Sequence, residues 1–398
     1  MTRQLYQGFF VRGSFWLFLI GMATMVACAS KPAGVLTSSI EPATLPGMPP
    51  VSDPKNLYGD AGANHLSTAV SGALPRVYVP DVKSNDVYVI NPATFKVVGY
   101  FKVGRSPQHV VPSWDLKTLW VANNAERTLK GSLTPIDPLT AKPGTPVEVE
   151  DPYNMYFTPD GLFAIVVAES SKRLDFRDPH TMQLRSSLAT PGCSGINHAD
   201  FAIDGKTAIF TCEFTGTLVK IDVLNRKVLG YLKLPAAGMP QDIRISPDGT
   251  TYFVADMMVD GVFVVDAATF KVTGFIPTGV GTHGLYPSRD GSKLYISNRG
   301  SHKIHGKRHG PGSVSVMDFA TRKIVATWPI PHGGSPDMGN VSADGKQLWL
   351  SGRYDHEVYC IDTTTGEVKR IRVGDQPHGL TVWPQPGRYS LGHTGNMR

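Results

Sequence analysis

Seven polar residues recur about once every 44 residues along this chain, each at or just before the start of a short apolar run. They are His109, Asn154, His198, Asp242, His283, Asp337 and His378. Four of the seven are histidines, and imidazole is a good ligand for Cu, Zn, Fe or Ni ions. If the repeat forms a ring, these side chains gather around its axis. They then form either a ligand-binding mouth or a metal site built from His109, His198, His283 and His378. Seven-fold spacing would spread four imidazoles widely, and none of these four histidines belongs to a His-x-x-x-His spacing that would support a preformed metal site.

A second set of chemically active residues lies in a basic, glycine-containing stretch, 298–312. Its charged and imidazole-bearing members are Arg299, His302, Lys303, His305, Lys307, Arg308 and His309. This stretch makes one repeat longer than the others, and insertions in repeat proteins usually map to the binding face. We expect a lid, a contact for an anion or a protein partner, or a solvated loop. The stretch has no aromatic residue to stack bases, which argues against nucleic acid.

Two cysteines in the middle of the chain can form either a disulfide or part of a metal site. Cys193 and Cys212 can form a disulfide, as exported proteins do, or can bind a soft metal together with His198. Cys360 lies in an apolar run and is expected to be a buried small hydrophobe. The chain has no Gly-x-Ser-x-Gly, no phosphate-binding glycine loop, no His-Glu-x-x-His and no Cys-x-x-Cys-His.

The elements that position these residues follow from a repeat of about 44 residues between Arg76 and Tyr389. Its markers are turns between short apolar runs, at Asp160-Gly161, Asp204-Gly205, Asp248-Gly249, Asp290-Gly291 and Asp344-Gly345. Asp-Gly between alternating apolar runs predicts a β-hairpin, since glycine accepts a positive φ. A repeat of roughly 40–45 residues with four strands is typical of a propeller blade. With 41 Gly, 31 Pro and 18% charged residues, the composition suits many turns.

We therefore predict an all-β fold, a seven-bladed β-propeller with four-stranded blades over residues 76–390. The first repeat has only three strands, so His378–Trp383 must supply its innermost strand in a one-plus-three closure. The Asp-Gly turns join the first and second strands and mark one face. The opposite face collects the seven recurring residues and the second-to-third strand connections. These connections carry Asp81, Asn123, Glu169, Glu213, Asp256, Arg299 and Arg353.

Several second strands resemble the Tyr-Val-Thr-Asn repeat of the YVTN β-propeller family. Examples are Trp120-Val121-Ala122-Asn123 and Tyr295-Ile296-Ser297-Asn298. The domain is similar to the YncE-like members, which are related to cytochrome d1-type propellers. The resemblance implies the fold. It also implies a structural role for Pro-His-Gly at the start of the first strand, where imidazole hydrogen-bonds loop backbone. It says little about function, because propellers host many activities.

The first 27 residues read as an export signal, with Arg3 and Arg12 before an apolar stretch. Met25-Val26-Ala27-Cys28 resembles a bacterial lipobox, which predicts a lipid anchor on Cys28 in the cell envelope, with the outer membrane favoured. The alternative is ordinary cleavage near Ala27 or Ala29. Residues 28–75 are expected to be a flexible tether, and 391–398 a C-terminal tail. The net charge of +6 is mild and gives little support for nucleic-acid binding.

Three functions remain open. The first is a monomeric scaffold in the periplasm that binds a small molecule or a protein through the channel mouth. The second is a metal- or cofactor-dependent oxidoreductase, or a cofactor-handling protein, that uses the histidine ring. It would hold a transition metal such as Cu or a haem-type group. The third is a hydrolase such as a lactonase, for which the carboxylates are few. The sequence favours the binding scaffold.

Overall fold

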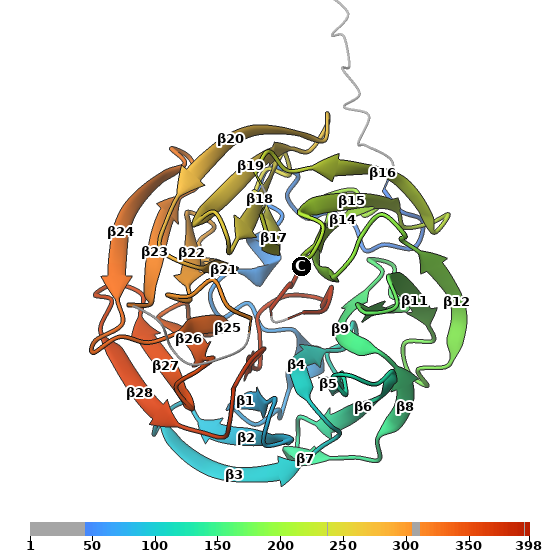
Figure 1. The fold of residues 1–398 in the computed structure, drawn as a ribbon. Coiled ribbons are helices and arrows are strands. Elements are labelled where there is room, and N and C mark those ends of the chain that lie inside the picture. The colour runs from blue at the N-terminus through green and yellow to red at the C-terminus, as the bar shows by residue number, and fades with distance from the viewer. Residues whose placement is uncertain (1–43, 237, 305–310, 394) are drawn as a thin grey trace, which may run out of the picture. The chain divides into compact units, whose positions relative to one another are not determined.

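The computed structural model describes residues 44–398 except 237, 305–310 and 394. Seven antiparallel sheets stand around a central axis, which confirms the predicted seven-bladed propeller (Figure 1). The innermost strands form short, fully buried runs around the channel. They are β29 (Thr381–Trp383), β4 (Pro107–Pro112), β9 (Pro152–Phe157), β13 (Ile196–Phe201), β17 (Pro240–Ile245), β21 (Thr282–Pro287) and β25 (Pro336–Val341).

The second strands are apolar and almost wholly buried. They are β1 (Arg76–Asp81), β5 (Leu119–Asn123), β10 (Ala164–Ala168), β14 (Thr207–Cys212), β18 (Thr251–Asp256), β22 (Lys293–Asn298) and β26 (Gln347–Gly352). The third strands follow outward. They are β2 (Asp86–Asn91), β6 (Lys130–Asp137), β11 (Arg173–Arg177), β15 (Thr217–Asp222), β19 (Gly261–Asp266), β23 (Ser313–Asp318) and β27 (Glu357–Asp362).

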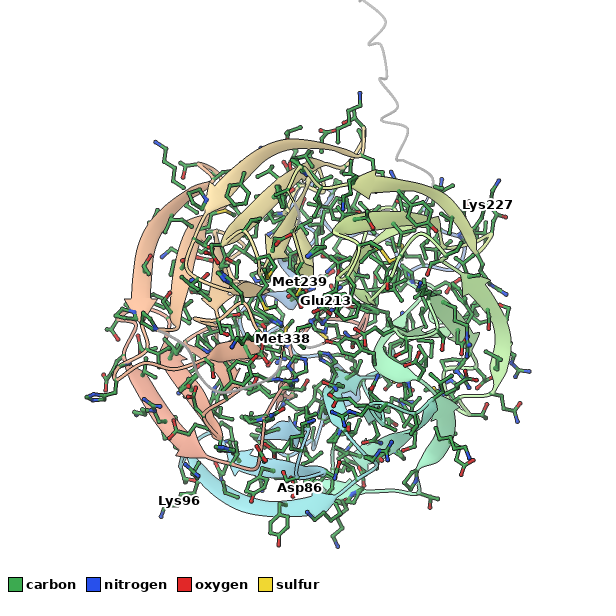
Figure 2. The ribbon with its side chains drawn as sticks, viewed as in Figure 1. Asp86, Lys96, Glu213, Lys227, Met239 and Met338 are labelled. Atoms are coloured by element: carbon green, nitrogen blue, oxygen red, sulfur yellow. A yellow bond between two sulfur atoms is a disulfide. The ribbon has the colours of Figure 1, made fainter. Side chains whose placement is uncertain are left out.

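The outer strands alternate between exposed and half-buried residues, as expected for a sheet with one solvated face. They are β3 (Lys96–Lys102), β7 (Lys142–Pro143) with β8 (Val147–Glu150), β12 (Leu184–Ala189), β16 (Lys227–Lys233), β20 (Lys271–Pro277), β24 (Lys323–Pro329) and β28 (Val368–Arg372). Figure 2 shows the same gradient: Lys96 and Lys227 lie at the rim, whereas Glu213 and Met338 lie near the axis.

The ring closes as predicted. Strand β29 pairs antiparallel with β1, with Val77 opposite Val382 and Tyr78 opposite Thr381. Blade 7 packs against the closed blade 1 through apolar residues: Trp349 of β26 stacks on Phe95 at 5.9 Å between ring centroids and packs into the cluster that holds Val382. Closing the ring leaves blade 1 without an unpaired inner edge.

Residues 44–75 differ from the expected flexible tether. They carry two short 3-10 helices, η1 (Gly59–Ala61) and η2 (Thr68–Val70). Their backbone N–H groups donate to the turns between first and second strands, from Leu45 to Asp204 at 2.8 Å and from Leu57 to Pro247 at 2.8 Å. This part of the chain is therefore fixed along the Asp-Gly face. Residues 1–43, with the expected signal and Cys28, lie outside the described residues.

The C-terminal residues also differ from the expectation of a tail beyond the fold. They enter the central channel, where the C-terminus lies in Figure 1. Leu391, Met397 and Arg398 are buried there. The Arg398 guanidinium lies 2.6 Å from Asp200 Oδ1, and Asn396 donates to the same oxygen at 3.1 Å. No helix among the described residues is long and apolar enough to cross a membrane.

Candidate functional site

The inner strands present two successive side chains to the channel, because each begins with an irregular register. In blades 2 to 7 the pairing of the first and second strands shifts within the opening residues of the inner strand, as between Pro240 and Ile243. Such a bulge breaks the alternation that would send one of two neighbours away from the axis. We call the group around Asp337, in which His283 and His378 line the channel-mouth cavity, the upper layer, and the ring residues His109, Asn154, His198 and Asp242, which do not line it, the lower layer.

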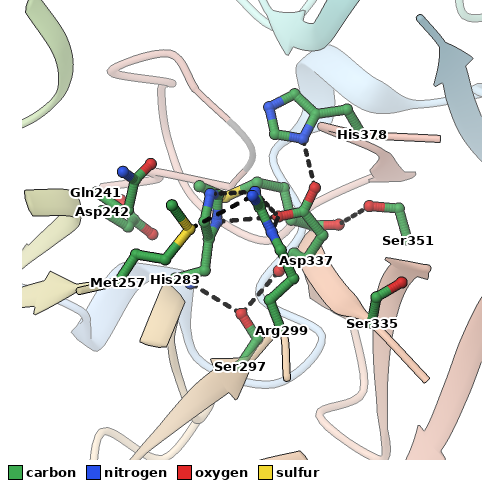
Figure 3. A network of polar contacts seen from close by, with 12 residues as sticks. Gln241, Asp242, Met257, His283, Ser297, Arg299, Ser335, Asp337, Ser351 and His378 are labelled. Atoms are coloured by element: carbon green, nitrogen blue, oxygen red, sulfur yellow. Dashed lines mark hydrogen bonds and ion pairs between the residues drawn. The ribbon is translucent and has the colours of Figure 1, made fainter. Parts of the chain in front are cut away.

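The upper layer is centred on Asp337. Its Oδ1 lies 3.0 Å from His283 Nδ1, and its Oδ2 lies 2.6 Å from His378 Nδ1. Arg299 donates to Oδ1 through Nε at 3.1 Å and Nη2 at 2.6 Å (Figure 3). Arg299 Nη2 also contacts His283 Nε2. Because Nε2 accepts from Arg299, the proton of a neutral His283 is on Nδ1, which lies close to Asp337 without a hydrogen bond to it.

The protonation states in this upper layer follow from burial and from the pairing. Burial would raise the pKa of Asp337, but Arg299 and the two imidazoles hold it well below its usual range. Burial lowers the pKa of His283 and takes that of His378 to about 4, although Asp337 opposes the shift at His378. Asp337 is therefore a charged carboxylate that contacts one charged guanidinium, that of Arg299, and two neutral imidazoles.

The lower layer holds His109, Asn154, His198 and Asp242, all fully buried. His393, from the C-terminal segment, lies among them. Its Nδ1 is 3.0 Å from Asn154 Nδ2, and its Nε2 is 3.7 Å from Asp242 Oδ1. The ring centroids of His109 and His198 are 5.4 Å apart, and those of His109 and His378 are 4.8 Å apart. The imidazoles thus lie closer together than seven-fold spacing suggested.

A cavity of about 480 Å³ opens above the upper layer, at the face opposite the Asp-Gly turns. Its walls come from the second-to-third strand connections of six blades and from inner-strand side chains such as Gln108, Tyr153 and Gln241. The lining includes the basic side chains of Lys83, Arg127, Arg299 and Arg353 and the acidic side chains of Glu126, Glu169 and Glu213. Lys83 pairs with Glu126 at 3.0 Å.

Glu169 and Glu213 form an acidic pair in this wall. Burial raises the pKa of Glu169 well above its usual value, and the charge of Glu213 adds to the shift. Burial also raises the pKa of Glu213, although Gln241, Arg299 and Asn197 oppose it. Asn197 Nδ2 donates to Glu213 Oε2 at 3.0 Å. The sequence places both carboxylates on the same face but does not pair them, because they come from different blades.

Other residues predicted at this face are structural. Asn123 donates to the Ser132 and Thr134 hydroxyls at 3.1 and 2.9 Å on the adjacent strand. Asp256 accepts the backbone N–H groups of Met239 and Met258. These side chains hold the ends of the second strands, and neither lines the cavity. Asp81 is buried at the same position of blade 1.

The residues of the predicted basic stretch that the structure describes lie in different environments. Arg299 belongs to the buried network around Asp337 rather than to a lid. His302 lies outside it, with Nε2 2.7 Å from Asp260 Oδ1. The Lys303 carbonyl accepts from Tyr354. His305, Lys307, Arg308 and His309 lie outside the described residues.

Cys193 and Cys212 form a disulfide with a Cα–Cα distance of 4.9 Å. A soft-metal site with His198 is therefore excluded for the paired form, because neither sulfur is a free thiolate. Cys360 is buried and unpaired, as predicted. The bridge fixes the loop before β13 to the end of β14, beside the cavity residue Glu213.

Sequence reasoning missed His393 and the second channel-facing position of several inner strands. The repeat could have indicated Gln108, Tyr153 and Gln241, since each directly precedes a residue of the predicted ring. For His393 the available signal was the presence of three glycines, Gly387, Gly392 and Gly395, within the short C-terminal segment, which indicates tight turns there. Each of the three glycines has a positive φ in the structure, which suits tight turns inside the channel.

The sequence matches the family described as YNCE-like beta-propeller over residues 44–386. The uncharacterized protein YncE of Salmonella typhi is 26% identical over 179 residues, which are 44% of this chain and 46% of that protein. Antigen Lp49 of Leptospira interrogans is 28% identical over 41% of this chain and 38% of its own length. The alignments thus span less than half of each relative.

Among solved structures, dihydro-heme d1 dehydrogenase NirN in complex with DHE has a TM-score of 0.57. It is 14% identical to this chain, and the match covers 77% of this chain and 75% of NirN. At this identity the likeness shows the fold alone. The repeat, the closed seven-bladed ring and the family match over residues 44–386 agree. The chain belongs to the YncE-like β-propeller family.

Proposed function

We propose that this protein is a binding scaffold of the bacterial cell envelope, and that its channel-mouth cavity holds a small polar ligand with an anionic group. Arg353 carries the proposal. It lines the cavity, and its Nε and Nη1 have no hydrogen-bond partner among the described residues. Buried polar groups are normally paired, and a guanidinium pairs best with a carboxylate or phosphate.

The size and walls of the cavity support a small ligand. About 480 Å³ lies within the roughly 300–1,000 Å³ usual for small-molecule sites. Arg299 faces the same space but is already paired with Asp337, and Lys83 is paired with Glu126. Arg127 is exposed, which leaves Arg353 as the buried guanidinium suited to an incoming anion. Glu169 and Glu213, which line the same cavity, suit a hydrogen-bond donor or a positive group on the same ligand. A dipolar molecule matches both kinds of side chain.

Native mass spectrometry of the protein isolated from its own envelope tests this proposal. We expect a small-molecule adduct on the wild type that is lost in Arg353→Gln, because glutamine cannot form the charged bidentate contact. Arg388→Gln is the matched control, since Arg388 pairs with Asp60 and lies away from the cavity. An adduct unchanged by Arg353→Gln would contradict the assignment of this cavity. Titration with citrate and with inorganic phosphate then distinguishes the two anion classes.

We further propose that the scaffold is exported and anchored through a lipid on Cys28. The support is the sequence alone, namely the basic start, the apolar stretch and Met25-Val26-Ala27-Cys28. Labelling cells with an alkyne fatty acid should mark the wild type but not Cys28→Ser. An unlabelled wild type that is still processed near residue 28 would instead indicate ordinary signal cleavage.

The alternative function, metal or cofactor chemistry at the histidines, is supported by one observation only. This observation is the cluster of His109, His198 and His393 in the lower layer. Because the cluster lies below the cavity and shares no residue with its lining, it carries an inference of its own.

A further inference from the structure

Three imidazoles converge inside the channel, one layer below the cavity. They belong to His109 on β4, His198 on β13 and His393 on the C-terminal segment, and all three are fully buried. The ligand atoms offered by the three residues lie within 4.8 Å of one another. Their ring centroids are 5.4 Å apart for His109 and His198, 5.2 Å for His109 and His393, and 4.6 Å for His198 and His393.

Polar contacts with Asn154 and Asp242 hold the His393 ring, but hydrogen bonding does not account for the other two imidazoles. Neither ring nitrogen of His109 or His198 has a hydrogen-bond partner among the described residues. A buried polar atom left without a partner destabilises the folded chain. Four such nitrogens at one point are therefore a considerable cost unless they bind something.

The backbone around the cluster is shaped to bring the rings together. His393 has a φ of 49°, a left-handed conformation that is uncommon for a residue with a side chain. Its backbone N–H donates to the Met155 carbonyl at 2.9 Å. A Cβ on Gly392 would lie 2.5 Å from the same carbonyl oxygen, and one on Gly379 would lie 2.0 Å from His109 Nδ1. Only glycine at these two positions lets His393 and His109 reach the axis.

We propose that His109, His198 and His393 bind a divalent transition-metal ion, Zn²⁺ or Cu²⁺, and that the C-terminal segment supplies the third ligand. Three imidazoles without sulfur suit these ions, and three protein ligands leave a coordination position open. Coordination at about 2.0–2.1 Å would draw the three nitrogens somewhat closer than they are here. Asp242, 3.7 Å from His393 Nε2, can orient that ring, as carboxylates do beside metal-bound histidines.

This site goes beyond ligand binding in the cavity, and the two are separable. Isothermal titration of the full chain, stripped with a chelator, with Zn²⁺ or Cu²⁺ should show one tight site per chain. His109→Gln and His393→Gln should weaken it by more than about 100-fold, since even outer partners of a metal site contribute about 10–100-fold. His356→Gln is the control, because His356 is exposed beside Asp375. Arg353→Gln should keep the metal even if it loses the cavity ligand.

Two outcomes would overturn the proposal. One is a wild-type chain that binds neither ion stoichiometrically. The other is folded His109→Gln and His393→Gln chains that bind as the wild type does. If a variant fails to fold, the stoichiometry of metal binding by the wild-type chain still tests the proposal. Co²⁺ bound by three nitrogens gives visible d–d bands without the charge-transfer absorption of a thiolate ligand, and a spectrum without these bands overturns the site.

Discussion

At the scale of single residues, Asp337 organises the channel mouth. One carboxylate accepts from His378 and Arg299 and lies 3.0 Å from His283 Nδ1, and all four groups are buried. A buried charge is tolerated only when it is paired and hydrogen-bonded. The sequence identified Asp337, His283 and His378 as members of one ring, because they share a place in the repeat. It could not pair them with Arg299, whose position in a longer connection suggested a surface loop.

The acidic pair in the cavity wall predicts a pH dependence of stability. Burial raises the pKa of Glu213 in the folded chain. Its stabilising contribution is thus complete below the ordinary glutamate pKa of about 4.3 and is lost as the pH rises through the raised value. Each unit of pKa shift corresponds to about 1.4 kcal/mol. We expect Glu213→Gln to flatten the fall in unfolding free energy above about pH 4.3 and to stabilise the chain most at alkaline pH.

Urea unfolding measured from pH 4 to 9 checks this expectation, with Glu126→Gln as the control. Glu126 lines the same cavity but pairs with Lys83 at 3.0 Å near the surface. Parallel pH profiles for Glu213→Gln and the wild type would show that the buried carboxyl does not titrate differently on folding.

At the scale of elements, the turns between first and second strands share a bond pattern that the Asp-Gly dipeptide only partly indicates. In blade 6 the Ser288 hydroxyl donates to Asp290 Oδ1 at 2.5 Å and accepts the Lys293 N–H at 2.9 Å. The other hydroxyls that make this pair of bonds are Ser113, Thr158, Ser246 and Ser342. Blade 4 has Ala202 at the corresponding position, although its backbone still bonds Thr207 at 2.9 Å.

Ala202→Ser should therefore stabilise the protein. The new hydroxyl can donate to Asp204 and accept the Thr207 N–H, and one net hydrogen bond contributes about 0.5–1.5 kcal/mol. Guanidinium unfolding should show a higher midpoint for Ala202→Ser and a lower one for Ser288→Ala. Ala202→Val serves as the control, because it adds volume without a hydroxyl. An equal effect of serine and valine would attribute the change to packing instead.

At the scale of the whole molecule, the sequence predicted what is periodic. The 44-residue repeat fixed the number of blades, the four strands in each and the closure by β29, because the same pattern of apolar runs and turns recurs seven times. The structure of residues 44–75 and 385–398 was not predicted, because neither segment belongs to the repeat. Tyr58, for instance, is fixed by one bond from its hydroxyl to the Ile245 carbonyl at 2.7 Å. Such a contact depends on the three-dimensional channel and leaves no local pattern.

Two truncations separate the ring from its C-terminal segment. A chain that ends at Pro386 keeps β29 but loses Arg398 and His393, so Asp200 loses its charged partner. Removing one partner of a buried pair costs about 3–5 kcal/mol, and we expect a folded monomer with a clearly lower thermal midpoint. A chain that ends at Gln376 also loses β29 and exposes the inner edge of β1. We expect that chain to unfold or to self-associate, because an open edge pairs with other chains.

Size-exclusion chromatography and thermal unfolding of both truncated chains, beside Arg398→Met, distinguish these contributions. Arg398→Met isolates the lost ion pair while the segment remains. If the Pro386 chain unfolds as Arg398→Met does, the ion pair explains most of the stability that the segment adds. If the Pro386 chain is much less stable, apolar burial of Leu391 and Met397 contributes the remainder. A Gln376 chain that stays folded and monomeric would contradict closure by β29, because blade 1 would then hold together with three strands.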